Sequence, residues 1–164
     1  MTLTLKKLLL IIAGAIGVVA AFLPWYKISI SFLGYSSSTS ANAFELGGIL
    51  YKISAILAIL AFVAVILSAV IDEKKIKKLI KIKDVAKTTM IVGIVMAAVT
   101  VINFIALQSE SKNIGAGGVS WGIWLMALAS VATIVFSVLK NKELDKVIAG
   151  AKPAAKKSEK AEKK

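Results

Sequence analysis

The side chains that most often carry catalysis or bind metals are scarce in this 164-residue chain. It contains no Cys, His or Arg, which excludes thiol chemistry, imidazole catalysis, disulfides and His or Cys metal sites. Carboxylates lie near apolar stretches at Glu45, Asp72, Glu73 and Asp84, and their spacing does not pair them for acid–base work. We therefore predict no catalytic residue, no metal and no cofactor in a protein that is not an enzyme. A membrane-bound lipid enzyme is the least favoured hypothesis.

A second set of polar residues lies inside long apolar stretches: Thr100, Asn103, Ser130 and Thr133. Asn103 either lines a small polar cavity with Thr100 or makes an interhelical hydrogen bond to Ser130 or Thr133, which is the interpretation we favour. The cores of the apolar stretches are free of Asp, Glu, Lys and His, the side chains that mark proton and ion pathways. This argues against an active transporter, whereas a channel lined by backbone or hydroxyl groups stays open.

Four apolar stretches must position these residues. A helix needs about 20 apolar residues to cross a hydrocarbon core of about 30 Å. The chain is 58% hydrophobic, with a mean hydropathy of +0.83, and its predicted spans are residues 8–26, 50–71, 88–108 and 119–139. We expect an all-α integral membrane protein. Residues 1–150 would form a bundle of four transmembrane helices, with a short extracytoplasmic β-hairpin between the first two.

Lysine supplies all 21 positive charges, and the net charge is +12. Eighteen of these lysines lie in the N-terminus, in residues 72–87 and in residues 140–164, and the other three are Lys27, Lys52 and Lys112. Lys-rich loops stay in the cytoplasm, so we predict a plasma-membrane protein with both termini inside, bound to anionic lipid headgroups at its cytoplasmic face. The absence of Arg disfavours specific nucleic-acid binding, and the Lys-only composition indicates a prokaryote.

The first span has a competing interpretation as a cleaved secretory signal peptide. Lys6 and Lys7 precede its apolar run, and Val19-Ala20-Ala21 is a candidate cleavage site. The length of the apolar run favours retention of the span. Cleavage after Ala21 would leave three spans without inverting the others.

Two Lys-rich segments are expected on the cytoplasmic side. The loop at residues 72–87 is predicted to be partly helical, and Ile76, Leu79 and Ile80 share a face that can rest on the membrane surface. Residues 151–164 are rich in Lys and Ala and of low complexity, so we expect a disordered tail.

The outer segment, residues 27–48, is predicted to form the hairpin. Its apolar residues alternate with polar ones, as in a half-buried strand, and Gly34 supplies a turn before a Ser-rich second strand. A lone hairpin is marginal in water, so its apolar face needs cover from the helix ends or from a partner. The candidate interaction surface is Ile28, Ile30, Phe32, Tyr35 and Glu45.

Two further features belong to the same side. Glu45 would bind a cation or a cationic partner or, as we favour, be a solvated carboxylate near a helix N-terminus. The second outer loop, residues 110–120, is short, polar and Gly-rich, which predicts a flexible connection.

Aromatic residues lie at the outer ends of the spans. Trp25 ends the first span, and Trp121 and Trp124 begin the last, where tryptophans anchor helices in the headgroup region. A second interpretation, compatible with the first, is that Trp25 packs under the hairpin and fixes the angle of the hairpin to the bundle. Pro24 can redirect the chain into the strand. We treat Pro24, Trp25, Trp121 and Trp124 as structural anchors.

Small residues recur at a spacing of four. Ala13, Gly17 and Ala21 form such a row in the first span, and Gly93 and Ala97 form one in the third. Rows of this kind let helix backbones approach each other, and we expect packing within one bundle rather than a dimer interface.

Two short runs carry a resemblance to known proteins. Phe22-Leu23-Pro24-Trp25 and Gly122-Ile123-Trp124-Leu125 resemble those of a group of small uncharacterised bacterial membrane proteins. The layout also resembles the claudin-type tetraspan plan, and residues 23–29 are similar to the start of the first outer loop in claudins. Claudins carry a cysteine pair in that loop that this chain lacks, so the resemblance implies the layout without barrier function or site residues.

Three functions follow in order of preference. The first is a non-enzymatic membrane scaffold or accessory subunit that binds a protein partner or a second copy of itself. The alternative is an oligomeric channel, holin-like pore or passive carrier, suggested by the hydroxyls and the small-residue rows. The third is the lipid enzyme introduced above.

Overall fold

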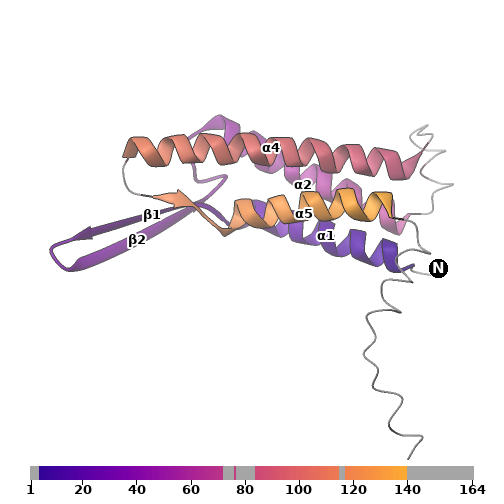
Figure 1. Cartoon of the computed structure of the whole chain (residues 1–164), viewed down its shortest axis with the longest axis horizontal. Coiled ribbons are helices and arrows are strands. Elements are labelled where there is room, and N and C mark those ends of the chain that lie inside the picture. Colours follow the sequence, from indigo (N-terminus) through magenta and orange to yellow (C-terminus); the bar gives the residue numbers. More distant parts are fainter. Residues whose placement is uncertain (1–3, 72–75, 77–83, 115–116, 140–164) are drawn as a thin grey trace, which may run out of the picture.

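The computed structural model describes residues 4–71, 76, 84–114 and 117–139 of the chain. Within them lie four helices long and apolar enough to cross a membrane: α1 (Leu5–Phe22), α2 (Ile49–Val70), α4 (Val85–Ile114) and α5 (Trp121–Val138). They form one elongated bundle (Figure 1). The prediction of four long apolar helices is confirmed.

The ends of the helices differ from the predicted spans. α1 covers residues 5–22 rather than 8–26, because Leu23 is extended, with φ −75° and ψ 158°, ahead of Pro24. α4 begins after Asp84, whose Oδ1 accepts the N–H groups of Ala86 at 3.0 Å and Lys87 at 3.2 Å, and it runs on to residue 114 instead of ending at 108.

Glycines set the closest approaches between helices. α1 packs against α2 and α5, and α4 packs against α5. A Cβ atom on Gly17 of α1 would lie 2.3 Å from the ring of Phe62 on α2, and one on Gly93 of α4 would lie 2.8 Å from the Ile134 side chain on α5. Both glycines belong to the small-residue rows, which therefore pack within the bundle.

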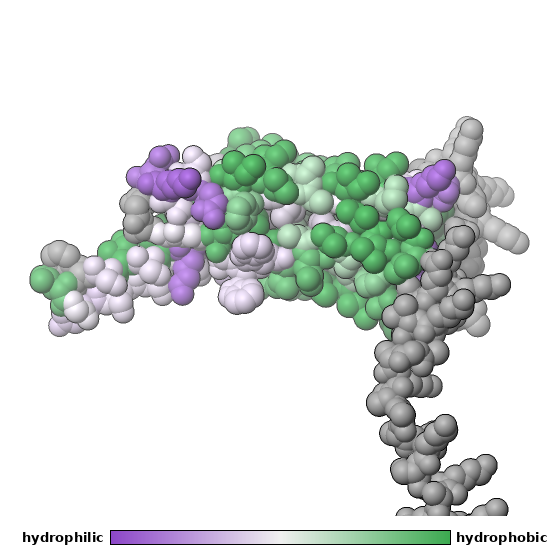
Figure 2. Space-filling view, in the orientation of Figure 1, coloured by the Kyte–Doolittle hydropathy of each residue, from purple (hydrophilic) through white to green (hydrophobic). Residues whose placement is uncertain are grey.

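The outward surface of the bundle is apolar over most of its length, as the green area of Figure 2 shows. Exposed apolar side chains come from every helix, for example Val19 on α1, Leu60 on α2, Ile105 on α4 and Leu128 on α5. A continuous apolar surface of this kind is uncommon on soluble monomers.

A small antiparallel sheet lies at the end of the bundle away from the N-terminus, with strand order β2-β1-β3. The strands β1 (Pro24–Phe32) and β2 (Tyr35–Asn42) form a hairpin that projects beyond the helices (Figure 1). The strand β3 (Gly118–Val119) pairs with the base of β1, Tyr26 opposite Val119 and Lys27 opposite Gly118. The predicted hairpin is confirmed, and the third strand is an addition to it.

One prediction near this sheet was wrong, because Trp25 and Tyr26 belong to β1 and not to the first helix. Of the segment 110–120, α4 includes residues up to 114, and residues 118–119 pair with the free edge of β1. The flexibility predicted for this segment stays a prediction.

Other predictions fall outside the described residues. They concern the loop at 72–87, including Asp72 and Glu73, and the tail at 151–164. Of that loop the structure describes Ile76, which is buried, and residues 84–87.

Candidate functional site

The carboxylates Glu45 and Asp84 make hydrogen bonds within the fold. Among residues 4–71, 76, 84–114 and 117–139, no three His, Cys, Asp or Glu side chains could hold a metal ion. Glu45 follows β2, and its Oε2 accepts the N–H of Asn42 at 2.9 Å, while Asn42 Oδ1 accepts the N–H groups of Phe44 at 2.9 Å and Glu45 at 3.2 Å. Glu45 thus closes a turn, as Asp84 caps α4.

The hydroxyls inside the bundle bond to their own helices. Thr100, Ser130 and Thr133 are buried, and each hydroxyl donates to the carbonyl oxygen four residues earlier, at 2.7, 2.8 and 2.8 Å respectively. A hydroxyl whose hydrogen is used in this way has less capacity to line a water-filled path.

Asn103 bonds across helices, but not to the predicted partners. Its Nδ2 donates to Ser54 Oγ on α2 at 2.9 Å and to the carbonyl oxygen of Val99 at 2.7 Å. Ser130 and Thr133 belong to α5, whereas the amide group of Asn103 reaches toward α2, so the prediction of those partners was wrong. Its buried Oδ1 has no hydrogen-bond partner among the described residues.

Trp25 locks the base of the hairpin to the bundle. Its side chain is fully buried, and Nε1 donates to the carbonyl oxygen of Ala20, in the last turn of α1, at 2.9 Å. Its own carbonyl oxygen accepts the N–H of Ser120 at 2.9 Å, just before α5. A Cβ on Gly122 would lie 2.6 Å from Trp25 Cδ1, so only glycine allows this approach. Trp25 therefore ties β1 to α1 and α5 and does not reach the surroundings of the bundle.

The other two tryptophans differ from Trp25 in exposure. Trp121 is 76% exposed and Trp124 is 57% exposed, and both lie at the start of α5. They are at the end of the helix where the sheet begins, and Pro24 begins β1 on the same side.

Tyr26 requires the glycine in the segment before β3. The Tyr26 side chain is buried, and a Cβ on Gly117 would lie 2.5 Å from its hydroxyl oxygen. Gly117 also has a φ of 146°, which side-chain-bearing residues rarely adopt. Gly117 therefore allows a close fit between the start of β3 and Tyr26 of β1.

The tip of the hairpin is its most exposed part. Phe32 pairs with Tyr35 across a two-residue turn in which φ is 47° at Leu33 and 83° at Gly34. Positive φ at both positions is the type I′ pattern, which prefers Asn followed by Gly. Leu33 is apolar and 82% exposed there. An apolar side chain held in a strained conformation, without cover, suggests a role outside the fold.

The predicted interaction surface is covered only at its base. Ile28 packs on the core, whereas Ile30 is 58% exposed and Tyr35 is 85% exposed. The side chain of Phe32 lies outside the described part of the chain. The strand is therefore half-buried at Ile28 and open farther along, and Glu45 lies at the opposite end of β2 from Tyr35. Sequence reasoning missed Leu33, although a Leu-Gly pair between two strand patterns was the available signal.

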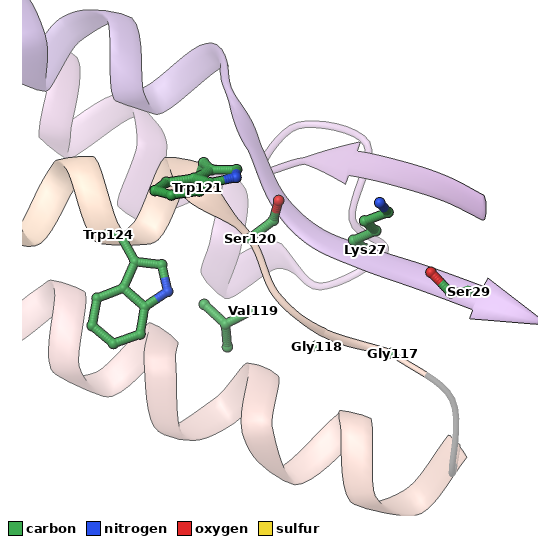
Figure 3. A pocket seen from close by; sticks show the side chains of 8 residues that line it. All are labelled: Lys27, Ser29, Gly117, Gly118, Val119, Ser120, Trp121 and Trp124. Carbon is green, nitrogen blue, oxygen red and sulfur yellow. The ribbon is translucent and has the colours of Figure 1, made fainter.

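An open groove with a volume of about 710 Å³ lies between the hairpin base and the start of α5 (Figure 3). Its polar side chains are Lys27 and Ser29 from β1 and Ser120 from the β3–α5 junction, and its aromatic side chains are Trp121 and Trp124. Sequence reasoning missed this groove, since it depends on the pairing of β3 with β1.

Two surfaces are thus available to other molecules: the hairpin tip, defined as Ile30, Leu33 and Tyr35, and the groove. Among the described residues, neither surface contains a carboxylate, and their ionisable side chains are Lys27 in the groove and Tyr35 at the tip. No protein-family model, curated protein or solved structure matches this chain.

Proposed function

We propose that the chain is a multi-pass plasma-membrane protein with both termini in the cytoplasm and the hairpin outside. The length and apolar surface of the four helices support insertion. The distribution of lysine supports the orientation, because Lys6 and Lys7 lie in the first turn of α1, at the end of the bundle away from the hairpin. The exposed Trp121 and Trp124 would then lie at the outer interface, where indole rings are favourable.

In this proposal α1 is retained in the mature protein. Gly17 packs on Phe62 of α2, and Ala20 accepts the hydrogen bond from Trp25. Cleavage after Ala21 would remove one side of the core and the acceptor that holds the hairpin base.

Within the membrane the chain acts as a non-enzymatic scaffold or accessory subunit, and the hairpin tip binds an extracytoplasmic protein partner. The observation that carries this function is the exposed Leu33 in its strained turn, flanked by the exposed Ile30 and Tyr35. The hairpin base is fixed by Trp25 and β3. A tip that is ordered before binding loses little conformational entropy when a partner covers it.

The alternative of an oligomeric channel, pore or passive carrier has less support. The buried hydroxyls of Thr100, Ser130 and Thr133 are engaged within their own helices. The lipid-enzyme hypothesis has the least support. Glu45 accepts a backbone hydrogen bond in the turn after β2, and Asp84 accepts one at the start of α4. Purified protein should therefore leave liposomes tight to ions and small solutes, and a protein-dependent flux would favour the channel.

A photo-crosslinking amino acid at position 35 tests the proposed function in native membranes. We expect a defined adduct. Mass spectrometry should identify its partner as a protein on the extracytoplasmic side of the plasma membrane or as a second copy of the chain. The matched control is the same amino acid at Ser38, which is also exposed on β2 but away from the tip. Absence of an adduct at position 35, or the same adducts from both positions, would contradict the proposal.

A further inference from the structure

The groove has one polar end with a single positive charge. Among the residues that the structure describes, Lys27 is the only ionisable side chain that lines it. Its ammonium group has no hydrogen bond or ion pair among the described residues, and no carboxylate lines the groove to neutralise it. Ser29 adds a hydroxyl group on β1 two residues farther from the bundle, and Ser120, opposite Trp25, adds one nearer α5, where its side chain does not cap the helix. This end is therefore suited to an anion that accepts several hydrogen bonds.

The backbone of β3 is accessible from the groove. Gly118 lines it without a side chain, and a Cβ there would meet nothing within 4 Å. The start of α5 follows immediately, and the positive end of a helix dipole favours a negative charge nearby. The dipole adds to the charge of Lys27 and would not define a site without it.

The other end of the groove is aromatic and continues into the apolar surface of the bundle. Trp124 packs edge-on against Phe104 of α4, with ring centroids 5.6 Å apart and an interplanar angle of 70°, which fixes its orientation. The exposed Ile105 of α4 and Leu128 of α5 belong to the same two helices. Figure 3 shows Trp121 and Trp124 toward α5 and Lys27 and Ser29 farther along β1. A ligand that fills the groove is therefore anionic at one end and apolar at the other.

We propose that the groove binds an anionic phospholipid of the outer leaflet, with its phosphate between Lys27 and Ser120, the rest of its headgroup toward Ser29, and its acyl chains along Trp124 and the helix surface. This inference rests on the proposed membrane insertion and orientation, which bring the groove to the lipid interface. Charge complementarity selects the headgroup, and continuity with the apolar belt selects a lipid over a free anion.

Tryptophan fluorescence in reconstituted vesicles tests the site. The chain has three tryptophans, and all lie at this end of the bundle, in β1 and α5. The full chain is placed in phosphatidylcholine vesicles containing either brominated phosphatidylglycerol or brominated phosphatidylcholine at equal mole fraction, since bromine quenches only nearby indoles. We expect the quenching to show about a fivefold preference of the protein for the anionic lipid. One Lys near an anionic lipid surface contributes an interaction energy that corresponds to this factor.

Two variants separate the site from general electrostatic attraction. Lys27→Gln should abolish the preference, and Lys112→Gln, which removes the same charge from the hairpin end of α4 outside the groove, should leave it. Resistance to alkaline extraction confirms that each variant is inserted. Equal quenching of the wild type by both lipids, or a preference that survives Lys27→Gln, would overturn the lipid site.

Two further outcomes have separate meanings. If neither brominated lipid quenches the wild-type protein, membrane insertion itself is refuted and the proposed function falls with it. If inorganic phosphate removes the preference while sodium chloride of equal ionic strength does not, the groove takes a free anion, and the lipid proposal is overturned while insertion stands.

Discussion

The bundle interior and the hairpin differ in what surrounds their side chains. Inside the bundle, glycines allow the helices to touch, and buried hydroxyls bond to the carbonyl oxygens of their own helices. Along β2, Tyr35 and the following residues up to Ser40 are exposed, and at the turn Leu33 has almost no cover. The bundle interior is closely packed and makes its hydrogen bonds internally, except for Asn103 Oδ1, which has no partner among the described residues. The tip of the hairpin instead leaves apolar side chains exposed.

This contrast predicts that substitutions in the two regions have different effects, on stability in the bundle and on binding at the tip. A change in the bundle interior should alter stability first, because interiors are close-packed and relax only partly. A change at the tip should leave stability almost untouched and alter binding. The four experiments below test this separation, in order of decreasing expected effect on stability.

The largest loss is expected from Gly17→Leu. Even its Cβ would lie 2.3 Å from the Phe62 ring, so α1 and α2 must separate. We expect the free energy of unfolding to fall by about 3 kcal/mol or more. Unfolding of the purified protein in detergent measures it. Ala15→Leu adds a similar side chain to an exposed position of α1 and should be nearly neutral; equal losses in both variants would contradict the packing described for Gly17.

Trp25→Phe tests the junction between the two regions. The substitution removes the Nε1 donor and leaves the carbonyl oxygen of Ala20 without that partner. This should lower the free energy of unfolding by about 2 kcal/mol. Hydrogen exchange should rise in β1 and β3 while the middle of α2 stays protected. Trp121→Phe, at an exposed indole, is the control. Unchanged exchange in β1 would show that Trp25 does not hold the hairpin base.

A double-mutant cycle of Asn103→Leu and Ser54→Ala probes the polar contact between α4 and α2. We expect a coupling energy of about 1 kcal/mol, typical of side-chain hydrogen bonds between membrane helices. Pairing Asn103→Leu with Ser130→Ala should give no coupling, because Ser130 bonds within α5. Coupling to Ser130 instead would restore the partner predicted from sequence.

The smallest effect on stability, and the sharpest on binding, is expected from Leu33→Asn. Asn tolerates the positive φ of this turn better than Leu, so the hairpin should gain about 0.5 kcal/mol. The adduct from a crosslinker at position 35 should nevertheless weaken, because the apolar tip is lost. Ser37→Asn, on the exposed part of β2, serves as the comparison. An adduct of full strength in Leu33→Asn would exclude Leu33 from the docking surface.

Sequence alone predicted the parts that depend on local pattern. Length and apolar composition predicted the four helices, and alternation around Gly34 predicted the hairpin. The partner of Asn103 could not be predicted, because it depends on how α4 is rotated against α2 and α5.

The site at the hairpin end depends on tertiary pairing. β3 has two residues, too few for any periodic signal, and exists because β1 offers it an open edge. The same pairing brings Ser120 and Trp121 toward Lys27 and so creates the groove. The local sequence pattern predicts neither the pairing of β3 with β1 nor the positive φ of Leu33. That φ follows from the strand register, in which Phe32 lies opposite Tyr35.

The chain order of the sheet has a consequence for biosynthesis. A ribosome completes β1 and β2 long before β3, which follows α4. Until Gly117 arrives, Tyr26 lacks its covering strand, and until Ser120 and Gly122 arrive, Trp25 is held from the α1 side alone. The hairpin therefore acquires its final base only when α5 begins to enter the bundle. A partner that requires this final hairpin position would therefore bind chains that already include residues 117–122 and pass over shorter nascent ones.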